Sequence, residues 1–148
     1  MKNKTLAAWL AFVGGPLGLH RFYLHGLGDI MGWALPLPTA LGLYGIERVQ
    51  RYGVDDTWSW LLIPLLGFTI AGCALTAIVY GLMTPEKWNA RFNPTAASDG
   101  AAGGTSWATI GAVALALLVG TTVLMASIAF SFQRYFEYQV EEGRKISQ

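Results

Sequence analysis

The amino-acid sequence predicts an all-α integral membrane protein. Four transmembrane helices form two antiparallel hairpins, and the last helix continues as an amphipathic extension. Hydrophobic residues make up 53% of the 148 residues and charged residues only 13%, whereas soluble domains carry about 25% charged residues. The apolar residues gather in four stretches, at 5–24, 27–46, 60–83 and 107–132. Each stretch approaches or exceeds the roughly 20 residues that a helix needs to cross the hydrocarbon core of a bilayer.

The first two stretches form one predicted domain, a two-helix hairpin over residues 4–48. So few residues join them that the two helices must run antiparallel. Pro16, Pro36 and Pro38 each lack a backbone donor, so we expect kinks at these positions. Small side chains recur at four-residue spacing, which lets helix backbones approach closely in a membrane. The residues predicted to pack the hairpin are Ala7, Ala11, Gly14, Gly15, Gly18, Gly28 and Gly32.

Charged and polar side chains lie where the two helices of this hairpin meet. Arg21 follows His20 at the end of the first stretch, and Asp29 comes eight residues after Arg21. An arginine near hydrocarbon either extends to the lipid headgroups or pairs with a carboxylate. The sequence leaves both arrangements open for Arg21.

The sequence shows no pattern typical of catalysis or of cofactor binding. His20 and His25 have no cysteine or His–carboxylate cluster beside them that would indicate a metal site. The chain also lacks a serine nucleophile elbow, a phosphate-binding loop and paired carboxylates within an apolar stretch. We therefore predict no enzyme activity, no cofactor and no metal. The net charge of +1 gives no reason to expect nucleic-acid binding.

A polar connection over residues 49–59 leads to a second predicted hairpin over residues 60–132. Its helices are expected at 60–83 and 107–132. The loop between them, over 84–106, is rich in small and polar residues, and we expect a helical turn after Pro85. No internal repeat is predicted, because the third and fourth apolar stretches resemble each other only in the residues that open them. The tryptophans near the span ends are expected to anchor at the headgroups: Trp58, Trp60, Trp88 and Trp107.

Residues 133–148 form a predicted amphipathic tail that continues the last helix out of the bilayer. Its aromatic residues alternate with charged ones, and Tyr135, Phe136 and Tyr138 are candidates for a surface that lies at the membrane interface or contacts a partner. With four alternating spans, seven Lys and Arg residues lie on the side of the termini and three on the other. This bias predicts that both termini are cytoplasmic.

The first hairpin resembles the TM-two domain family of small membrane proteins. The resemblance covers residues 4–48 and rests on Lys4, the run Gly14-Gly15-Pro16-Leu17-Gly18, the segment His20-Arg21-Phe22-Tyr23-Leu24 and the ending Tyr44-Gly45-Ile46-Glu47. The chain departs from the family at His25, where glycine is usual, and at Glu47, where aspartate is usual. The resemblance implies a two-helix hairpin in the bacterial cytoplasmic membrane, with proposed roles in signalling or as an accessory subunit. The second hairpin lies outside it.

Two functions follow as hypotheses. The first is a non-enzymatic accessory or assembly subunit that packs laterally on a larger membrane complex, such as an energy-converting one. Its partners would be membrane lipid and other membrane subunits or further copies of the chain. The alternative is a small oligomeric transporter or channel whose polar path uses His20, Arg21 and Asp29.

Overall fold

The structure, a computed structural model, describes residues 1–95 and 100–147. Every regular element within these ranges is a helix, which confirms the all-α prediction. Residues 96–99 of the predicted loop and residue 148 of the predicted tail lie outside the described residues. The helices, with η marking a 3-10 helix, are α1 (Lys4–Gly14), η1 (Gly15–Leu17), α2 (Leu19–His25), α3 (Ile30–Ala34), α4 (Pro36–Tyr52), α5 (Thr57–Leu82), α6 (Pro85–Phe92), η2 (Ala101–Gly103) and α7 (Trp107–Ile146).

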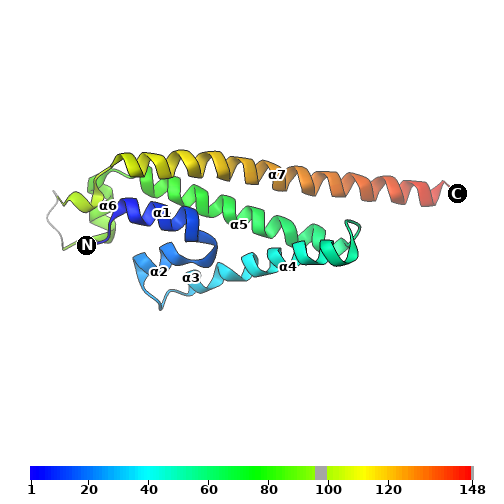
Figure 1. The fold of residues 1–148 in the computed structure, drawn as a ribbon, viewed down its shortest axis with the longest axis horizontal. Helices are drawn as coiled ribbons and strands as arrows, with labels where there is room; N and C mark the ends of the chain where they lie inside the picture. Colours follow the sequence, from blue (N-terminus) through cyan, green and yellow to red (C-terminus); the bar gives the residue numbers. More distant parts are fainter. Residues whose placement is uncertain (96–99, 148) are drawn as a thin grey trace.

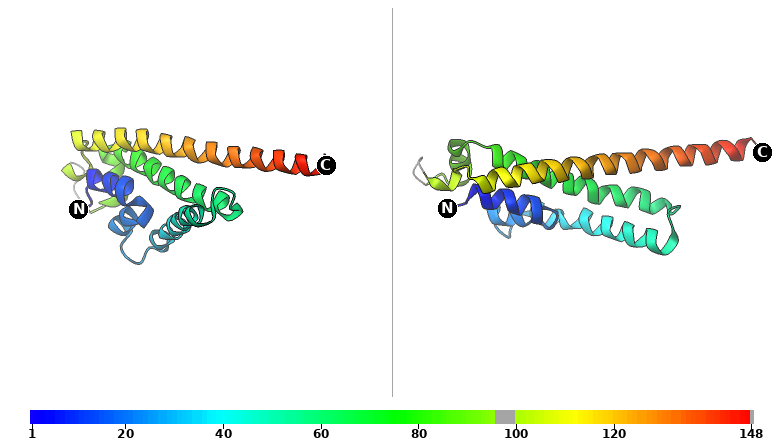
Figure 2. Two further views of the ribbon diagram at one scale, coloured as in Figure 1. Left: turned by 45° about the vertical axis from the view of Figure 1, so that its right-hand side comes forward. Right: turned by 45° about the horizontal axis from the view of Figure 1, so that its top comes forward.

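α5 is the central helix of the fold (Figure 1). α4 packs antiparallel along the first part of α5, and α1 packs along its later part. α7 runs antiparallel to α5 and continues beyond it along the long axis of the molecule (Figures 1 and 2). The two chain termini lie at opposite ends of this axis. The prediction that both termini are cytoplasmic depended on four alternating spans and loses that basis here.

Two helices of the described chain are long and apolar enough to cross a membrane. They are α5 and the stretch Ala101–Ile146 that contains α7. The sequence analysis predicted four such helices, and the structure corrects that number to two. The other two predicted spans are each divided into shorter helices.

The first predicted span is divided because the chain reverses within it. α1 ends at Gly14, η1 follows, and α2 runs back beside α1 (Figure 1). Gly18 makes the reversal: its φ is 76°, its N–H donates to the Gly15 carbonyl at 2.8 Å, and Pro16 fits the first turn of η1. Left-handed backbone of this kind favours glycine. The Gly-Gly-Pro-Leu-Gly run is therefore a turn between two short helices rather than part of a crossing helix.

The second predicted span is bent at Leu35, between α3 and α4. Pro36 occupies the first turn of α4, where a missing N–H costs little. The Thr39 hydroxyl lies within hydrogen-bonding distance of two carbonyls near the prolines, at 2.8 Å from the Pro16 oxygen and 3.1 Å from the Leu35 oxygen. The Thr39 hydroxyl thus links α4 to η1 and to the residue that precedes α4.

Small residues set the helix contacts, as predicted, but with α5 as the main partner. A Cβ on Gly15 would lie 2.4 Å from the Cys73 Cβ of α5, and a Cβ on Gly18 would lie 2.1 Å from the Gly32 carbonyl oxygen. Gly14 and Gly32 are similarly crowded, and Ala7 and Ala11 are fully buried. The prediction for Gly28 is wrong, because it is exposed and a Cβ there would meet nothing within 4 Å. The sequence analysis missed the packing glycines of the later helices: Gly42, Gly45, Gly67, Gly81 and Gly120.

α6 confirms the helical turn expected after Pro85 and corrects the role of one tryptophan. Trp88 is fully buried among Ala7, Leu24 and Phe92, so it is a core residue rather than a headgroup anchor. Its indole N–H donates to the Lys2 carbonyl at 2.8 Å. Trp58 and Trp107 are 65% and 86% exposed, as interfacial anchors would be.

Candidate functional site

Arg21 pairs with Asp29 at the corner between α2 and α3. The Arg21 Nε donates to Asp29 Oδ2 at 2.6 Å, and Nη2 donates to Oδ1 at 3.1 Å. The same carboxylate caps α3 by accepting from the Gly32 N–H at 3.1 Å. The hydrogen bond from Arg21 holds the pKa of the Asp29 carboxyl below its usual range. Of the two arrangements that the sequence left open, the structure thus forms the ion pair.

A second arginine–aspartate pair of the same design joins α4 to α5. The Arg48 Nε donates to Asp56 Oδ2 at 2.8 Å, and Nη2 donates to Oδ1 at 2.7 Å. Asp56 caps α5 by accepting from the Ser59 N–H at 3.1 Å. The hydrogen bond from Arg48 and those from Ser59 lower the pKa of the Asp56 carboxyl. Glu47, predicted as a structural polar residue, instead pairs with Arg51 on the exposed face of α4.

The two corners are a local repeat that the sequence analysis missed. In each, a glycine follows the arginine by five residues and the aspartate follows it by eight. Gly26 has φ 86° and ψ 173°, and Gly53 has φ 86° and ψ 178°. This backbone region is essentially restricted to glycine. The pattern Arg-x4-Gly-x2-Asp in residues 21–29 and 48–56 is the signal that could have revealed it.

The other residues of the predicted hairpin motif have structural contacts. The Phe22 ring lies against Gly32 and is 5.0 Å from the Trp33 ring, measured between centroids. The Tyr23 hydroxyl accepts a hydrogen bond from the Asn3 N–H at 2.8 Å. Both residues therefore hold α2 against its neighbours.

Lys4 is a buried cation that the sequence analysis did not single out as such. Its side chain is fully buried, and Nζ donates to the Met83 carbonyl at 2.9 Å and to Thr105 Oγ1 at 2.7 Å. Lys4 thereby ties the start of α1 to the end of α5 and to the residues before α7. Burial lowers the pKa of the Lys4 ammonium.

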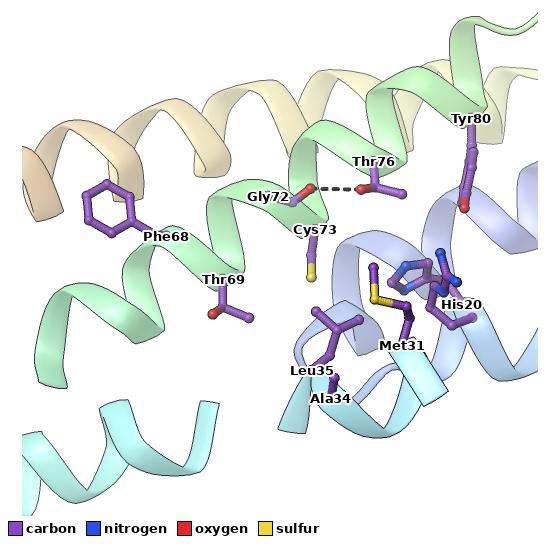
Figure 3. Close-up of a pocket in the computed structure, with 11 residues that line it drawn as sticks. His20, Met31, Ala34, Leu35, Phe68, Thr69, Gly72, Cys73, Thr76 and Tyr80 are labelled. Carbon is purple, nitrogen blue, oxygen red and sulfur yellow. Dashed lines mark hydrogen bonds between the residues drawn. The ribbon is translucent and has the colours of Figure 1, made fainter. Parts of the chain in front are cut away.

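A cleft of about 380 Å³ opens between α2, α3 and α5 (Figure 3). His20 forms part of its wall and is only 3% exposed. Within the part of the chain that the structure describes, His20 Nδ1 is buried and has no hydrogen-bond partner. The cleft is lined by His20, Arg21, Met31, Ala34, Leu35, Phe68, Thr69, Gly72, Cys73, Thr76 and Tyr80. Of the predicted polar residues, His20 and Arg21 therefore line the cleft, whereas Asp29 pairs with Arg21 at the start of α3 and is not a lining residue.

The aromatic residues predicted on the tail lie on the continuous helix α7. Tyr135, Phe136 and Tyr138 are exposed, and the Tyr138 ring also makes an edge contact with the Trp60 ring of α5, with 6.1 Å between centroids. Beyond this contact α7 continues alone to its end (Figure 1). The predicted boundary at residue 133 therefore falls inside one helix.

The described residues contain no group of three or more His, Cys, Asp or Glu side chains placed to hold a metal ion. Comparison of the chain with protein-family models, with curated proteins and with solved structures gives no match. The likeness to the TM-two domain family therefore remains a prediction from residues 4–48.

Proposed function

We propose that this chain is a non-enzymatic integral membrane protein that serves as an accessory or assembly subunit, with α7 as the helix that contacts its partner. The observation that carries the proposal is α7 itself. It is 40 residues long, or about 60 Å at 1.5 Å per residue, which is about twice the thickness of the hydrocarbon core. Its first part is apolar and its last part carries exposed aromatic and charged residues.

The exposed apolar surface of α5 and α7 supports a membrane location. Soluble monomers rarely expose contiguous apolar patches larger than a few hundred Å². Here many large apolar side chains on the two helices are exposed, among them Leu61, Phe68, Leu75, Val79, Leu82, Leu117, Leu118, Leu124 and Met125. A bilayer would cover this surface, and the resemblance of the first hairpin favours the bacterial cytoplasmic membrane.

The partner surface that we propose is the part of α7 around Tyr135 and Phe136. Aromatic side chains are enriched in protein interfaces because they bury a large area at a small entropic cost. Tyr135 and Phe136 have exposed rings, whereas Arg134 beside them is held by an ion pair with Glu137 at 2.7 Å. The partner is thus a protein with an apolar surface near the membrane boundary.

The transporter alternative has less support from this geometry. A polar path needs ionisable groups that are free to bind an ion, but both oxygens of the Asp29 carboxylate already accept hydrogen bonds from Arg21. Residues of α5 on the cleft are mainly apolar or small, and the hydroxyls of Thr69 and Thr76 donate to carbonyls of α5 itself.

Photo-crosslinking in the native membrane tests the accessory role. A photoreactive amino acid at Tyr135 is expected to capture one protein of defined mass, which co-purifies in mild detergent. The matched control places the same group at Leu118, which is 66% exposed on the apolar part of α7, and is expected to capture lipid only. Two results together would contradict the accessory role and favour transport. The first is that the chain purifies as an oligomer with no cross-linked partner, and the second is that it conducts ions in proteoliposomes unless Arg21 is replaced by alanine.

The two termini are expected on opposite sides of the membrane, because they lie at opposite ends of the long axis along which α5 and α7 run (Figure 1). Cys73 is the only cysteine and is buried. A Cys73→Ala background with a new cysteine at Asn3 or at Ser147 can therefore be labelled in intact cells with a thiol reagent that does not cross membranes. One of the two sites is expected to react and the other to react only after lysis. Equal reactivity in intact cells would contradict this topology.

A further inference from the structure

At the end of the cleft that His20 forms, the buried Nδ1 of the imidazole has no hydrogen-bond partner among the described residues. A buried polar atom without a partner is costly, and such atoms are rare in folded proteins. Figure 3 shows the His20 ring and the Tyr80 side chain at the same end of the cleft, with Phe68 and Thr69 at the other end. A head group at this end lies against the His20 ring, and a rotation of the ring toward the cleft lets a ligand oxygen pair with the buried Nδ1.

A second, apolar groove adjoins this cleft across α5. It has a volume of about 340 Å³ and lies between α5 and α7, where Leu75, Ala116 and Leu124 are among its lining residues. Phe68 and Gly72 line both hollows. Gly72 has no side chain, and a Cβ there would meet nothing within 4 Å. At Gly72, therefore, no side chain of α5 separates the cleft from the groove. A single ligand that is longer than either cavity could occupy both.

The charges around the cleft favour an uncharged head group. Arg21 lines the cleft, but two of its N–H groups are already bound to the Asp29 carboxylate. The Asp29 carboxylate balances the charge of Arg21, so an anionic head would meet no uncompensated cation, and a cationic head would meet no carboxylate among the described lining residues. The imidazole can donate to a carbonyl oxygen or accept from a hydroxyl without any charge.

We propose that the cleft and the adjoining groove bind one membrane-soluble amphiphile. Its uncharged head, which bears carbonyl or hydroxyl oxygens, lies beside His20, and its hydrocarbon tail crosses α5 at Gly72. Quinones and diacylglycerols share this chemistry. The site lies wholly within one chain, so it is independent of the protein partner proposed above.

Native mass spectrometry of the purified full-length chain in detergent micelles tests the site. The probes are decylbenzoquinone and dioctanoylglycerol, each titrated alone, with dioctanoyl phosphatidylglycerol as an anionic competitor. We expect one bound probe per chain. Loss of the hydrogen bond in His20→Leu is expected to weaken binding about tenfold, and Gly72→Leu is expected to do the same by blocking the passage between the hollows.

Matched variants separate the site from general effects. His25→Leu changes an exposed histidine outside the cleft, and Gly111→Leu adds a side chain to α7 where a Cβ meets nothing within 4 Å. Both are expected to bind like the unchanged chain. His20→Gln, which keeps a donor and an acceptor, is expected to restore most of the affinity that His20→Leu loses. Far-UV circular dichroism and size-exclusion chromatography check that each variant is folded.

The outcomes are distinct. Saturable binding of either neutral probe that follows this pattern supports the proposal, and the tighter probe identifies the head group. Binding of both probes that is unchanged in His20→Leu and Gly72→Leu overturns it, as does displacement by the anionic lipid at equal concentration. No partner protein is present in this measurement. A negative result therefore contradicts only the ligand site, and the accessory role is tested separately by photo-crosslinking.

Discussion

Replacing Trp88 with alanine is expected to lower the free energy of unfolding by about 3 to 5 kcal/mol, the range for fully buried large aromatic residues. The Trp88 ring lies 4.5 Å from the Phe92 ring and 5.8 Å from the Tyr80 ring, measured between centroids. Its loss leaves a cavity between α6, α5 and α1, and the Lys2 carbonyl loses the indole donor at 2.8 Å. The main attachment of α6 to the rest of the fold is therefore removed.

The reactivity of the Cys73 thiol measures the stability of the Trp88→Ala variant. Cys73 is buried and is the only cysteine of the chain, so a fluorogenic thiol reagent reports unfolding of the detergent-solubilised protein directly. Trp58→Ala is the control, because Trp58 is exposed and its replacement is expected to change stability by less than about 1 kcal/mol. Equal unfolding temperatures for the two variants would show that Trp88 does not hold α6 in place.

Replacing Gly18 with alanine is expected to destabilise the protein by about 2 to 5 kcal/mol. The left-handed backbone, with φ 76°, costs a residue with a Cβ about 1 to 2 kcal/mol. The new Cβ would also lie 2.1 Å from the Gly32 carbonyl oxygen, and overpacking of this kind typically costs about 1 to 3 kcal/mol. Backbone atoms on both sides make the clash hard to relieve.

Two further variants divide this effect into its parts. Gly28→Ala adds a Cβ where nothing lies within 4 Å, and it is expected to leave the unfolding temperature nearly unchanged. Gly18→Asn tolerates the left-handed backbone better but keeps the Cβ, so it is expected to remain clearly destabilised. If Gly18→Asn is as stable as the unchanged chain, the close approach of α2 and α3 at Gly32 is not rigid.

The sequence predicted the helical class and the two long apolar helices because a continuous run of apolar residues, as in α5 and α7, has few other stable forms in a membrane. The sequence does not distinguish one helix that crosses the membrane from two shorter helices between which the chain reverses direction, because both consist of the same apolar run. Composition is the same in both cases, and the difference lies in the φ of one residue, Gly18. Pro16 predicted a kink in the Gly-Gly-Pro-Leu-Gly run, but the reversal of the chain there depends on the close approach of Gly18 to Gly32.

The candidate site was predictable only where its contacts are local in sequence. Arg21 and Asp29 are eight residues apart, and their pairing was one of two arrangements that the sequence left open. The cleft beside His20 needs α5, which follows about 50 residues later, and its position depends on how α2 packs after the reversal. Trp88 shows the same limit, since an indole near a span end is equally typical of a headgroup anchor, and only its contact with Lys2 distinguishes the two.

The two corner repeats also bear on the order in which the chain can fold as it is synthesised. Each corner closes over eight residues, and contacts between residues so close in sequence form early because little chain entropy is lost. The contacts of the N-terminal segment are the opposite case: Trp88 reaches Lys2 over 86 residues, and Lys4 reaches Thr105 over 101. The corners can thus form as soon as their residues emerge. The N-terminus stays unattached until α6 and the residues before α7 have been made, so its docking is the step that completes the fold.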